Sequence, residues 1–214
     1  MGNTLILRSP IPVSVNHYIK PRPVVRNING KQVVQSAIYE TKQAKDYKAA
    51  FKKYIINEVK LQNYTLQPNK TQHFYIDCVF YFKTKGCDAN NYFKLLLDAI
   101  TETRLIWLDD DVCCERVQGI YFDSHDPHID IIIHPVDYVG IFPSIEHLNE
   151  FKKMCMTCSR YTHNCSLLRK AEEGRIQEEI KDYCCEKYKK QRSMVQNEEN
   201  RKNVCRENII QKNG

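Results

Sequence analysis

Residues 86–116 read GCDANNYFKLLLDAITETRLIWLDDDVCCER, and the pattern of this stretch decides the predicted fold. Between positions 90 and 103 the residues follow helical spacing, with a polar stripe of Asn91, Lys94 and Asp98. The opposite side, which we expect to be buried, consists of Tyr92, Phe93, Leu96, Leu97, Ala99 and Ile100. The chain's only tryptophan, Trp107, follows, then three aspartates and the strand-like run CCERVQGIYF. A helix that returns to a strand in this way predicts a helix packed on a β-sheet.

The segments on either side extend the same alternation of strands and helices. The dipeptide Asn29-Gly30 between β-branched pairs predicts a hairpin, because both residues accept the positive φ of a two-residue turn. A helix is expected from Thr41 to Leu61, and the runs HFYIDCVFYFK and HIDIIIHPV are expected to be strands, the second of them central. With a first strand from Thr4 to Leu7, the order is β, β-hairpin, α, β, α, β, β. The sequence therefore predicts an α/β (α+β) fold, a small mixed sheet with two packed helices.

Length, charge and cysteine content limit the class of protein. A chain of 214 residues can bury a real core, and a formal net charge of +6 suits a partner that carries phosphates without requiring one. Ten cysteines would suit disulfides in a secreted protein, but the run MGNTLILRSPIPVSV lacks the pattern of a signal peptide. No apolar stretch approaches the ~20 residues of a membrane span. We therefore expect a cytoplasmic protein that has no membrane partner.

The composition changes after Val136. Residues 1–136 carry the alternating strands and helices, whereas residues 140–214 are rich first in cysteine and then in Glu, Lys, Gln and Arg. The latter residue types have strong helix propensity. The sequence therefore predicts a domain over residues 1–136, followed by a Cys-rich, mainly helical extension of unknown role over residues 140–214.

The acidic residues of the quoted stretch are the candidate metal ligands. Asp88 stands where it could simply cap the helix, and Lys94 with Asp98 could be a surface ion pair of small energetic value. The run of three adjacent carboxylates is harder to explain, because like charges repel unless they are solvated or bound to a cation. The candidate ligand set is Asp88, Asn90, Asp109, Asp110 and Asp111.

Chain geometry allows the two acidic groups to meet. A helix from Asn90 to Thr103 advances ~20 Å at ~1.5 Å per residue, and an extended return from Thr103 to Asp110 covers about the same distance at ~3.3 Å per residue. Carboxylates from both ends can therefore share one hard cation. Oxygen ligands without a nearby histidine favour Mg²⁺ or Mn²⁺ over zinc.

These residues resemble the RusA family of Holliday-junction resolvases, whose signature is an Asp-x-Asp-Asn pair leading a helix, a lysine one turn on, and a Trp-x-Asp-Asp segment on the return. The matching stretches are Asp88-Ala89-Asn90-Asn91, Lys94, Leu97-Asp98-Ala99-Ile100 and Trp107-Leu108-Asp109-Asp110, and the run PIPVSVNHYIKPR looks like the family's Asn-rich N-terminal loop. The resemblance covers roughly residues 4–135. It implies a RusA-like fold and a metal-dependent endodeoxyribonuclease that cuts Holliday junctions in DNA recombination and repair.

The resemblance also implies catalytic roles for Asp88, Asp110 and Lys94: the two aspartates bind the metal, and the lysine steadies phosphate or the attacking water. Asn90 stands where the family often has its second aspartate. An amide oxygen can still bind a hard cation, but it brings no negative charge and cannot act as a base. Asn90 could remain a ligand, or another aspartate of the triplet could take its role. The alternative is a non-catalytic branched-DNA binding protein in which Asn90 has weakened the metal site.

Residues near the N-terminus are candidates for holding the DNA. They are Asn16, His17, Tyr18, Lys20, Arg22 and Arg26, with Lys31 nearby. Basic side chains can contact phosphates, which position a duplex without reading its sequence, but an ordinary solvated hairpin is the other interpretation. By the resemblance, the partner is branched DNA in the form of a four-way junction and the protein is a homodimer, because two symmetric nicks require a twofold assembly.

The cysteine-rich stretch contains a second candidate metal site. The run CMTCSRYTHNC places Cys155, Cys158, His163 and Cys165 within eleven residues, and the first two have the spacing of a zinc-binding knuckle. A Zn²⁺ site from these four, or one in which Cys184 or Cys185 replaces the histidine, is one interpretation. Free thiols in a helical tail are the other. A zinc-stabilised adaptor whose important surface is the tail is a further functional hypothesis.

Overall fold

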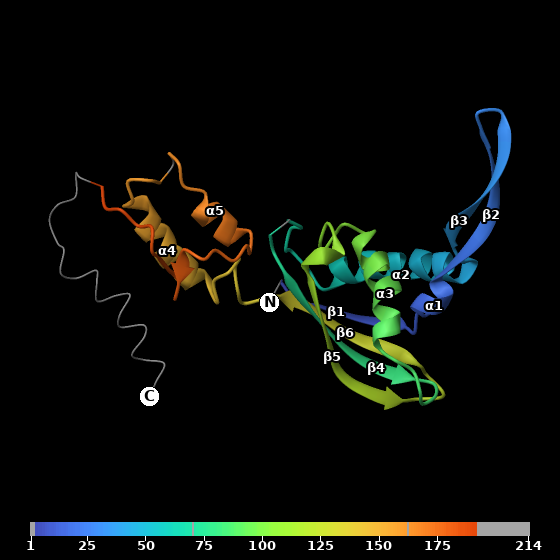
Figure 1. The fold of residues 1–214 in the computed structure, drawn as a ribbon. Coiled ribbons are helices and arrows are strands. Elements are labelled where there is room, and N and C mark those ends of the chain that lie inside the picture. Colours follow the sequence, from blue (N-terminus) through green and yellow to red (C-terminus); the bar gives the residue numbers. More distant parts are fainter. Residues whose placement is uncertain (1–2, 70, 162, 192–214) are drawn as a thin grey trace. The chain divides into compact units, whose positions relative to one another are not determined.

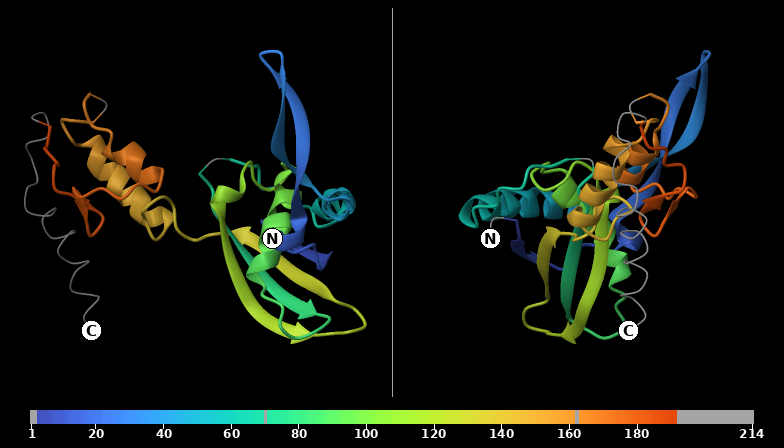
Figure 2. Two further views of the ribbon diagram at one scale, coloured as in Figure 1. Left: turned by 45° about the vertical axis from the view of Figure 1, so that its right-hand side comes forward. Right: turned by 90° about the vertical axis from the view of Figure 1, so that its left-hand side faces the viewer.

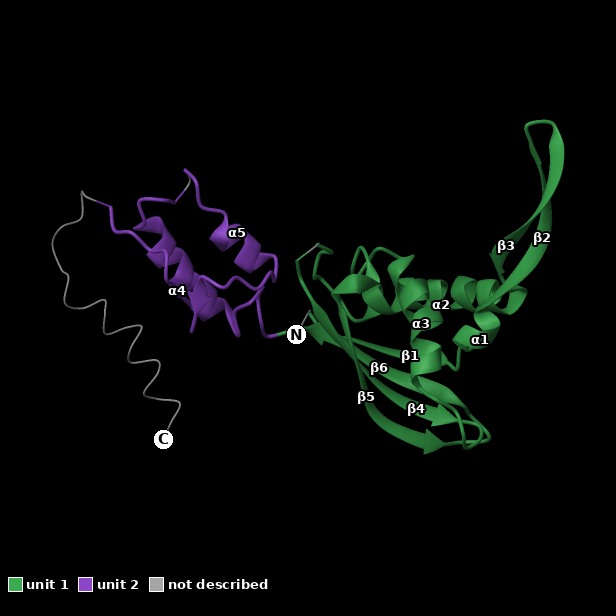
Figure 3. Cartoon of the chain, viewed as in Figure 1, with its two compact units in different colours: residues 1–136 green, residues 137–214 purple. Residues whose placement is uncertain are grey.

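The computed structural model describes residues 3–69, 71–161 and 163–191. It divides into two compact units, residues 1–136 and 137–214, which are coloured separately in Figure 3. In chain order, the elements of the first unit are β1 (Leu5–Pro10), α1 (Val15–Tyr18), β2 (Ile19–Ile28), β3 (Lys31–Glu40), α2 (Lys42–Leu61), β4 (Phe74–Phe82), α3 (Asn90–Thr101), the 3₁₀ turn η1 (Asp110–Val112), β5 (Cys113–Phe122) and β6 (His128–Pro135). Apart from the short α1 and η1, this is the predicted order of strands and helices, and the fold is a mixed α+β fold.

The main sheet of the first unit has four strands in the order β1-β6-β4-β5 (Figure 1). β6 pairs antiparallel with both β1 and β4, so its predicted central position is confirmed. β5 runs parallel to β4. Because parallel neighbours cannot be joined by a tight turn, the chain crosses between them through α3.

One face of this sheet is covered by α2 and α3, which lie on the same side of it in Figures 1 and 2. Along β4 every second residue is fully buried beneath the helices: Phe74, Ile76, Cys78, Phe80 and Phe82. The same core contains Phe51 and Ile55 from α2 and Phe93, Leu96 and Ile100 from α3. Burial of apolar surface contributes about 25 cal/mol per Å², so this layer is the main source of stability in the unit.

The predicted helix from Thr41 to Leu61 is confirmed as α2. Thr41 is its N-cap, and the hydroxyl of Thr41 accepts a hydrogen bond from the backbone N–H of Ala44 at 3.4 Å. The N-cap satisfies one of the backbone donors that a helix start leaves without a partner. Most lysines of α2 are exposed, Lys48 is buried, and the apolar side of the helix enters the core.

The hairpin of β2 and β3 forms a separate two-stranded sheet that extends away from the main sheet and the helices (Figures 1 and 2). As predicted, it turns at Asn29 and Gly30, whose φ angles are 52° and 79°. Directly paired residues of an antiparallel ladder point to the same face. By this register Lys20, Arg22, Arg26 and Lys31 share one face, and Pro21, Pro23, Val25, Val34 and Ile38 share the other. The arm therefore has a basic face and an apolar face.

The second unit contains α4 (Ile145–Met156), α5 (Leu167–Glu172) and a small sheet of β7 (Ile180–Lys181) and β8 (Cys184–Cys185). Its core is small and is built around Phe142, Leu148, Phe151, Cys155 and Ala171. The prediction of a mainly helical extension over residues 140–214 is not supported by the described part of that range, and residues 192–214 lie outside the described residues. The chain leaves α5 at Gly174, whose φ is 77°, and turns again at Asp182 and Tyr183 with φ of 46° and 59°. Local turns thus override the helix propensity of single residues.

No described helix of either unit is long and apolar enough to cross a membrane.

The helix-covered face of the sheet yields a stability prediction. We expect Leu96→Ala to lower the free energy of unfolding by about 2–5 kcal/mol, because it opens a cavity between α3 and the sheet. Leu61→Ala makes the same chemical change at a side chain that is 74% exposed, so we expect a change within about 0.5 kcal/mol. Urea denaturation followed by the fluorescence of Trp107 measures both. Equal effects of the two substitutions would contradict the described packing of α3.

Candidate active site

The polar stripe of α3 presents Lys94 to two carboxylates. The ammonium nitrogen of Lys94 lies 2.8 Å from Oδ1 of Asp98, one turn further along the helix, and 3.2 Å from Oδ2 of Asp110 in η1. The hydrogen bond to Asp98 is the largest cause of a raised pKa for Lys94, and it outweighs the lowering effect of burial together with the contribution of Asp110. Lys94 therefore carries its charge at neutral pH. The return segment therefore brings Asp110 back alongside α3.

The return segment is anchored by Trp107, which brings Asp110 to this place. Arg104, with φ of 52°, turns the chain after α3. The indole of Trp107 is fully buried against Phe74, and its Nε1 donates a hydrogen bond to the hydroxyl of Thr101 at 2.7 Å. The segment is therefore held against the last turn of α3, and η1 begins three residues beyond the tryptophan.

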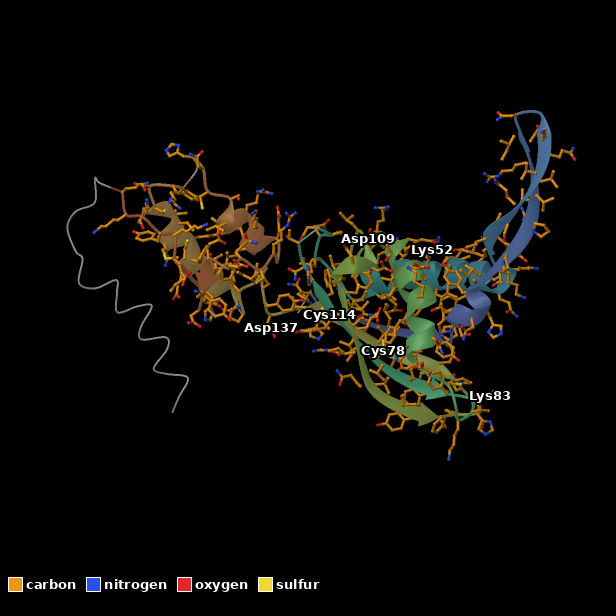
Figure 4. The ribbon with its side chains drawn as sticks, viewed as in Figure 1. Lys52, Cys78, Lys83, Asp109, Cys114 and Asp137 are labelled. Atoms are coloured by element: carbon orange, nitrogen blue, oxygen red, sulfur yellow. The ribbon has the colours of Figure 1, made fainter. Side chains whose placement is uncertain are left out.

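Asp88 sits at the start of α3. One of its carboxylate oxygens accepts a hydrogen bond from the backbone N–H of Asn90 at 3.0 Å, although Ala89 occupies the N-cap position, and both Asp88 and Asn90 are exposed. Among the described side-chain contacts none joins Asp88 to Asp110. Asp109 lies on the segment between α3 and β5 (Figure 4), and it and Asp111 are exposed.

Glu115 on β5 belongs to the same site and was missed by sequence reasoning. The pKa of Glu115 is raised, first by desolvation and then by the negative charge of Asp110, while Lys94 acts in the opposite direction. Glu115 thus stands within electrostatic reach of both residues. The only signal for Glu115 in the sequence was its place five residues after Asp110 in a strand-like run. The alternation of a strand does not by itself show whether Glu115 points to the face covered by α3.

Tyr18 connects this site to the base of the hairpin. It is buried, and its hydroxyl lies within hydrogen-bond distance of the carboxylates of both Asp98 and Glu40. A phenol has one proton, so it can donate fully to only one carboxylate at a time. Burial, followed by the hydrogen bonds to the two carboxylates, raises the pKa of Tyr18. The predicted DNA contact of Tyr18 is not supported, because this side chain is 8% exposed and holds Asp98 instead.

A buried lysine continues the network behind Tyr18. The ammonium of Lys48 pairs with Glu40 at 2.6 Å and also with Glu102, which in turn pairs at 2.6 Å with Lys52 on α2 (Figure 4). Burial lowers the pKa of Lys48, but hydrogen bonds and charges of Glu102 and Glu40 outweigh it and leave the pKa raised. Removing one partner of such a buried group is costly, so the network fixes Glu40 and with it Tyr18.

The donor chemistry of the site matches a hard cation. Asp88, Asp110 and Glu115 offer carboxylate oxygens and Asn90 an amide oxygen, which are the ligand types of Mg²⁺. Desolvation and then the charge of Asp110 raise the pKa of Glu115, and Lys94 acts in the opposite direction without reversing the shift. Within the part of the chain that the structure describes, however, no group of three or more His, Cys, Asp or Glu side chains already has the arrangement of a metal site. The residues fit the ion in kind, and Lys94 takes up one oxygen of Asp110.

Most of the predicted DNA contacts lie on accessible surface. Asn16 and His17 are exposed in α1. Lys20, Arg22 and Arg26 are exposed on the basic face of the hairpin, and the guanidinium of Arg22 lies 5.6 Å from the centre of the Tyr39 ring on that face. The register adds Lys31 to the same face.

The predicted zinc ligands are in the second unit, and the structure brings three of the four together. Cys155, Cys158 and Cys165 line one pocket. His163 is exposed and does not line it, whereas Cys185, one of the alternatives considered from the sequence, does.

A mixed sheet with one covered face, a lysine between carboxylates and a basic arm are together suited to an enzyme that acts on a phosphate-rich polymer. A protein-family model described as Endodeoxyribonuclease RusA matches residues 12–134, and the chain belongs to this family. Membership implies Holliday-junction-resolving endodeoxyribonuclease activity, with branched DNA as the partner. The match includes the hairpin and the acidic cluster and ends before the second unit. A comparison with curated proteins finds no match.

The link between Tyr18 and Asp98 gives a prediction with a matched control. We expect Tyr18→Phe to lower the free energy of unfolding by about 1–3 kcal/mol, because two partly buried carboxylates lose a hydrogen-bond donor. Tyr64→Phe removes a buried hydroxyl that has no partner among the described residues, so we expect no loss or a slight gain. Urea denaturation at neutral pH measures both. A loss as large for Tyr64→Phe would show that the effect of Tyr18→Phe does not come from its hydrogen bonds.

Proposed function

We propose that this protein is a Mg²⁺-dependent endodeoxyribonuclease that cleaves four-way DNA junctions by phosphodiester hydrolysis, in DNA recombination and repair. The observation that carries the proposal is the placement of Lys94 between Asp98 and Asp110 beside Glu115, within the region that matches the family. A charged lysine among carboxylates provides both a donor for a phosphate and ligands for a cation.

Asp88 and Asp110 are the proposed principal metal ligands. The remaining oxygens would come from Asn90, Asp109 or Asp111, and Mn²⁺ is a possible substitute because it accepts the same ligand types. When bound, the ion lowers the pKa of a coordinated water and neutralises charge at the scissile phosphate. Glu115 is a further candidate ligand, on the evidence of its raised pKa near Asp110.

Lys94 acts as a fixed positive charge in this proposal. Its raised pKa argues against a role as proton acceptor at neutral pH, because the ammonium has no lone pair to offer. Asp98 keeps the side chain in place at 2.8 Å even when Asp110 turns to another partner. The ammonium is then free to hold a phosphate oxygen of the substrate, where it stabilises the charge that develops as water attacks.

Tyr18 and Asp98 are positioning residues in the same proposal. Asp98 orients Lys94, Tyr18 orients Asp98, and Glu40 with Lys48 holds Tyr18 from behind. The arrangement is fixed before substrate arrives, so less free energy is spent on ordering during the reaction.

The basic face of the hairpin is the proposed DNA-holding surface. Lys20, Arg22, Arg26 and Lys31 all lie there, and the opposite face carries no basic residue. With Asn16 and His17 exposed at the base of the arm, this surface can contact phosphates without reading base sequence.

The proposed active assembly is a homodimer. A four-way junction is resolved by two symmetric nicks, and a twofold assembly supplies two equivalent active sites. The second candidate function is non-catalytic binding of branched DNA, which is favoured by one observation: Asn90 is neutral, and the described carboxylates have no ready-made metal arrangement.

A junction-cleavage assay tests the function. With a labelled four-way junction and Mg²⁺, we expect paired symmetric nicks that Asp110→Asn reduces by at least ~100-fold, because it removes a charged ligand and a partner of Lys94. Asp123→Asn is the matched control, since Asp123 lies in the loop after β5 and we expect it to leave the rate unchanged. Sedimentation of the same sample should report two chains per particle.

The Asn90→Asp variant separates the two candidate functions. If the natural chain is a nuclease, Asn90→Asp should retain or increase cleavage, because it adds a negative ligand. If the natural chain binds junctions but makes no nicks with Mg²⁺ or Mn²⁺, and Asn90→Asp restores them, the binding function is correct and the nuclease proposal is wrong.

The salt dependence of junction binding tests the hairpin. The logarithm of the association constant falls with the logarithm of salt concentration by ~0.9 per phosphate contact. We expect the triple substitution Arg22→Gln, Arg26→Gln and Lys31→Gln to reduce this slope by about two to three. The control is Lys45→Gln, Lys53→Gln and Lys60→Gln, which removes the same charge from exposed positions of α2. Equal slopes in the two triple variants would mean that net charge, and not the arm, determines binding.

A further inference from the structure

The second unit gathers four cysteines around one pocket of about 200 Å³. Cys155 lies in the last turn of α4 and Cys158 just after it, Cys165 lies in the segment before α5, and Cys185 lies in β8. Thirty residues separate the first from the last, so chain connectivity alone does not bring them together. Cysteines that converge from three separate segments are the usual ligand supply of a structural zinc site.

The thiols are close enough to affect one another. Burial raises the pKa of Cys155 to about 12, and Cys185, Cys165 and Cys158 contribute to that rise in this order. Burial also raises the pKa of Cys185, and Cys165 and Cys158 add to that rise. All four thiol groups therefore belong to one cluster. Cys78, by contrast, is buried in the core of the first unit.

Backbone N–H groups already point at two of the sulfurs. The amide of Lys189 donates to Sγ of Cys158 at 3.5 Å, and the amide of Lys187 hydrogen-bonds to Cys185. Such bonds favour the thiolate over the thiol and orient the sulfur, as the second layer of a metal site does.

The surroundings also suit a negatively charged metal centre. Zinc bound by four thiolates carries a net charge of −2, and Arg160, Arg169 and Lys187 line the same pocket, together with one carboxylate, Glu172, which pairs with Lys152 at 2.6 Å. The unit has fewer than ~80 residues and only a small core, a size at which a metal often supplies the missing stability.

We infer that Cys155, Cys158, Cys165 and Cys185 bind one structural Zn²⁺ that joins the three segments of the second unit. Binding forms four Zn–S bonds and breaks four S–H bonds, and the four protons pass to solvent. In the described residues the thiols do not yet have the arrangement of a metal site. Bonds of ~2.3 Å therefore require the side chains to rotate toward a common centre, for which the pocket leaves room. The site lies outside the family match and is independent of the nuclease chemistry.

The experiment uses the full chain, purified under reducing conditions, incubated with Zn²⁺ and freed of unbound metal. Elemental analysis should find about one zinc per chain. Cys165→Ser and Cys185→Ser should each reduce this to near zero. His163→Ala and Cys114→Ser should retain it, since His163 lies outside the pocket and Cys114 lies on β5.

A spectrum of the natural chain loaded with Co²⁺ covers the case in which a cysteine variant fails to fold. Tetrahedral thiolate ligation gives intense visible bands and a sulfur-to-cobalt charge-transfer band, and added Zn²⁺ should abolish both. A natural chain that holds no zinc, cobalt bound without these bands, or zinc retained by both Cys165→Ser and Cys185→Ser would each overturn the inference. Four additional reactive thiols per chain on chelation would support it, whereas recovery of these cysteines as disulfides in reducing buffer would contradict it.

Discussion

The site of the first unit depends on the position of the Lys94 ammonium group, which core packing, Asp98 and Asp110 fix together. It sits on the one stripe of α3 that does not enter the core, so the packing of Phe93, Leu96 and Ile100 against the sheet fixes the direction of its side chain. Asp98 then holds it from the same helix and Asp110 from the return segment. The second contact comes from the return segment, which Trp107 holds against Thr101. The packing of the core therefore determines the geometry of the site in this fold.

The ion pairs of Lys48 with Glu40 and Glu102 help to fix the long, flexible side chain of Lys94. Lys48 is 7% exposed, and a buried ammonium without partners would be strongly destabilising, so Glu40 and Glu102 must both be present. Glu40 also ends β3, which means that the base of the hairpin, Tyr18 and Asp98 are held by the same group of hydrogen bonds. The arm proposed to hold DNA and the lysine proposed to hold the scissile phosphate thus have a common support. A change at the base of the arm can therefore reach Lys94 through the hydrogen bonds of Tyr18 to Glu40 and Asp98 and the ion pair of Asp98 with Lys94.

Sequence reasoning succeeded where the relevant signal was local. The 3.6-residue period identified α2 and α3, the Asn29-Gly30 turn identified the hairpin, and the length of the return segment showed that Asp110 can come back alongside α3. It failed where the signal is a contact between distant positions. Tyr18 meets Asp98 across eighty residues, and nothing in the pattern around Tyr18 distinguishes an exposed aromatic from a buried one. The helical prediction for the tail failed for a related reason: propensities add up single residues, whereas Gly174 and the turn at Asp182 and Tyr183 follow from how the segment folds back.

The neutral side chain at position 90 has to be judged against the charges that surround it. Lys94 already offsets one unit of negative charge, and it contacts Oδ2 of Asp110, an oxygen that a cation could also bind. An aspartate at position 90 would strengthen cation binding at Asp110 by adding a negative charge. Asparagine lacks this charge and therefore favours the contact of Asp110 with Lys94. Glu115 has the opposite effect, because it adds a second carboxylate near Asp110 whose repulsion a cation would relieve; its pKa is raised first by desolvation and then by the charge of Asp110. Glu115 on β5 can thus supply the negative charge that Asn90 lacks. Whether the site attracts a divalent ion depends on the sum of these charges and not on the identity of residue 90 alone.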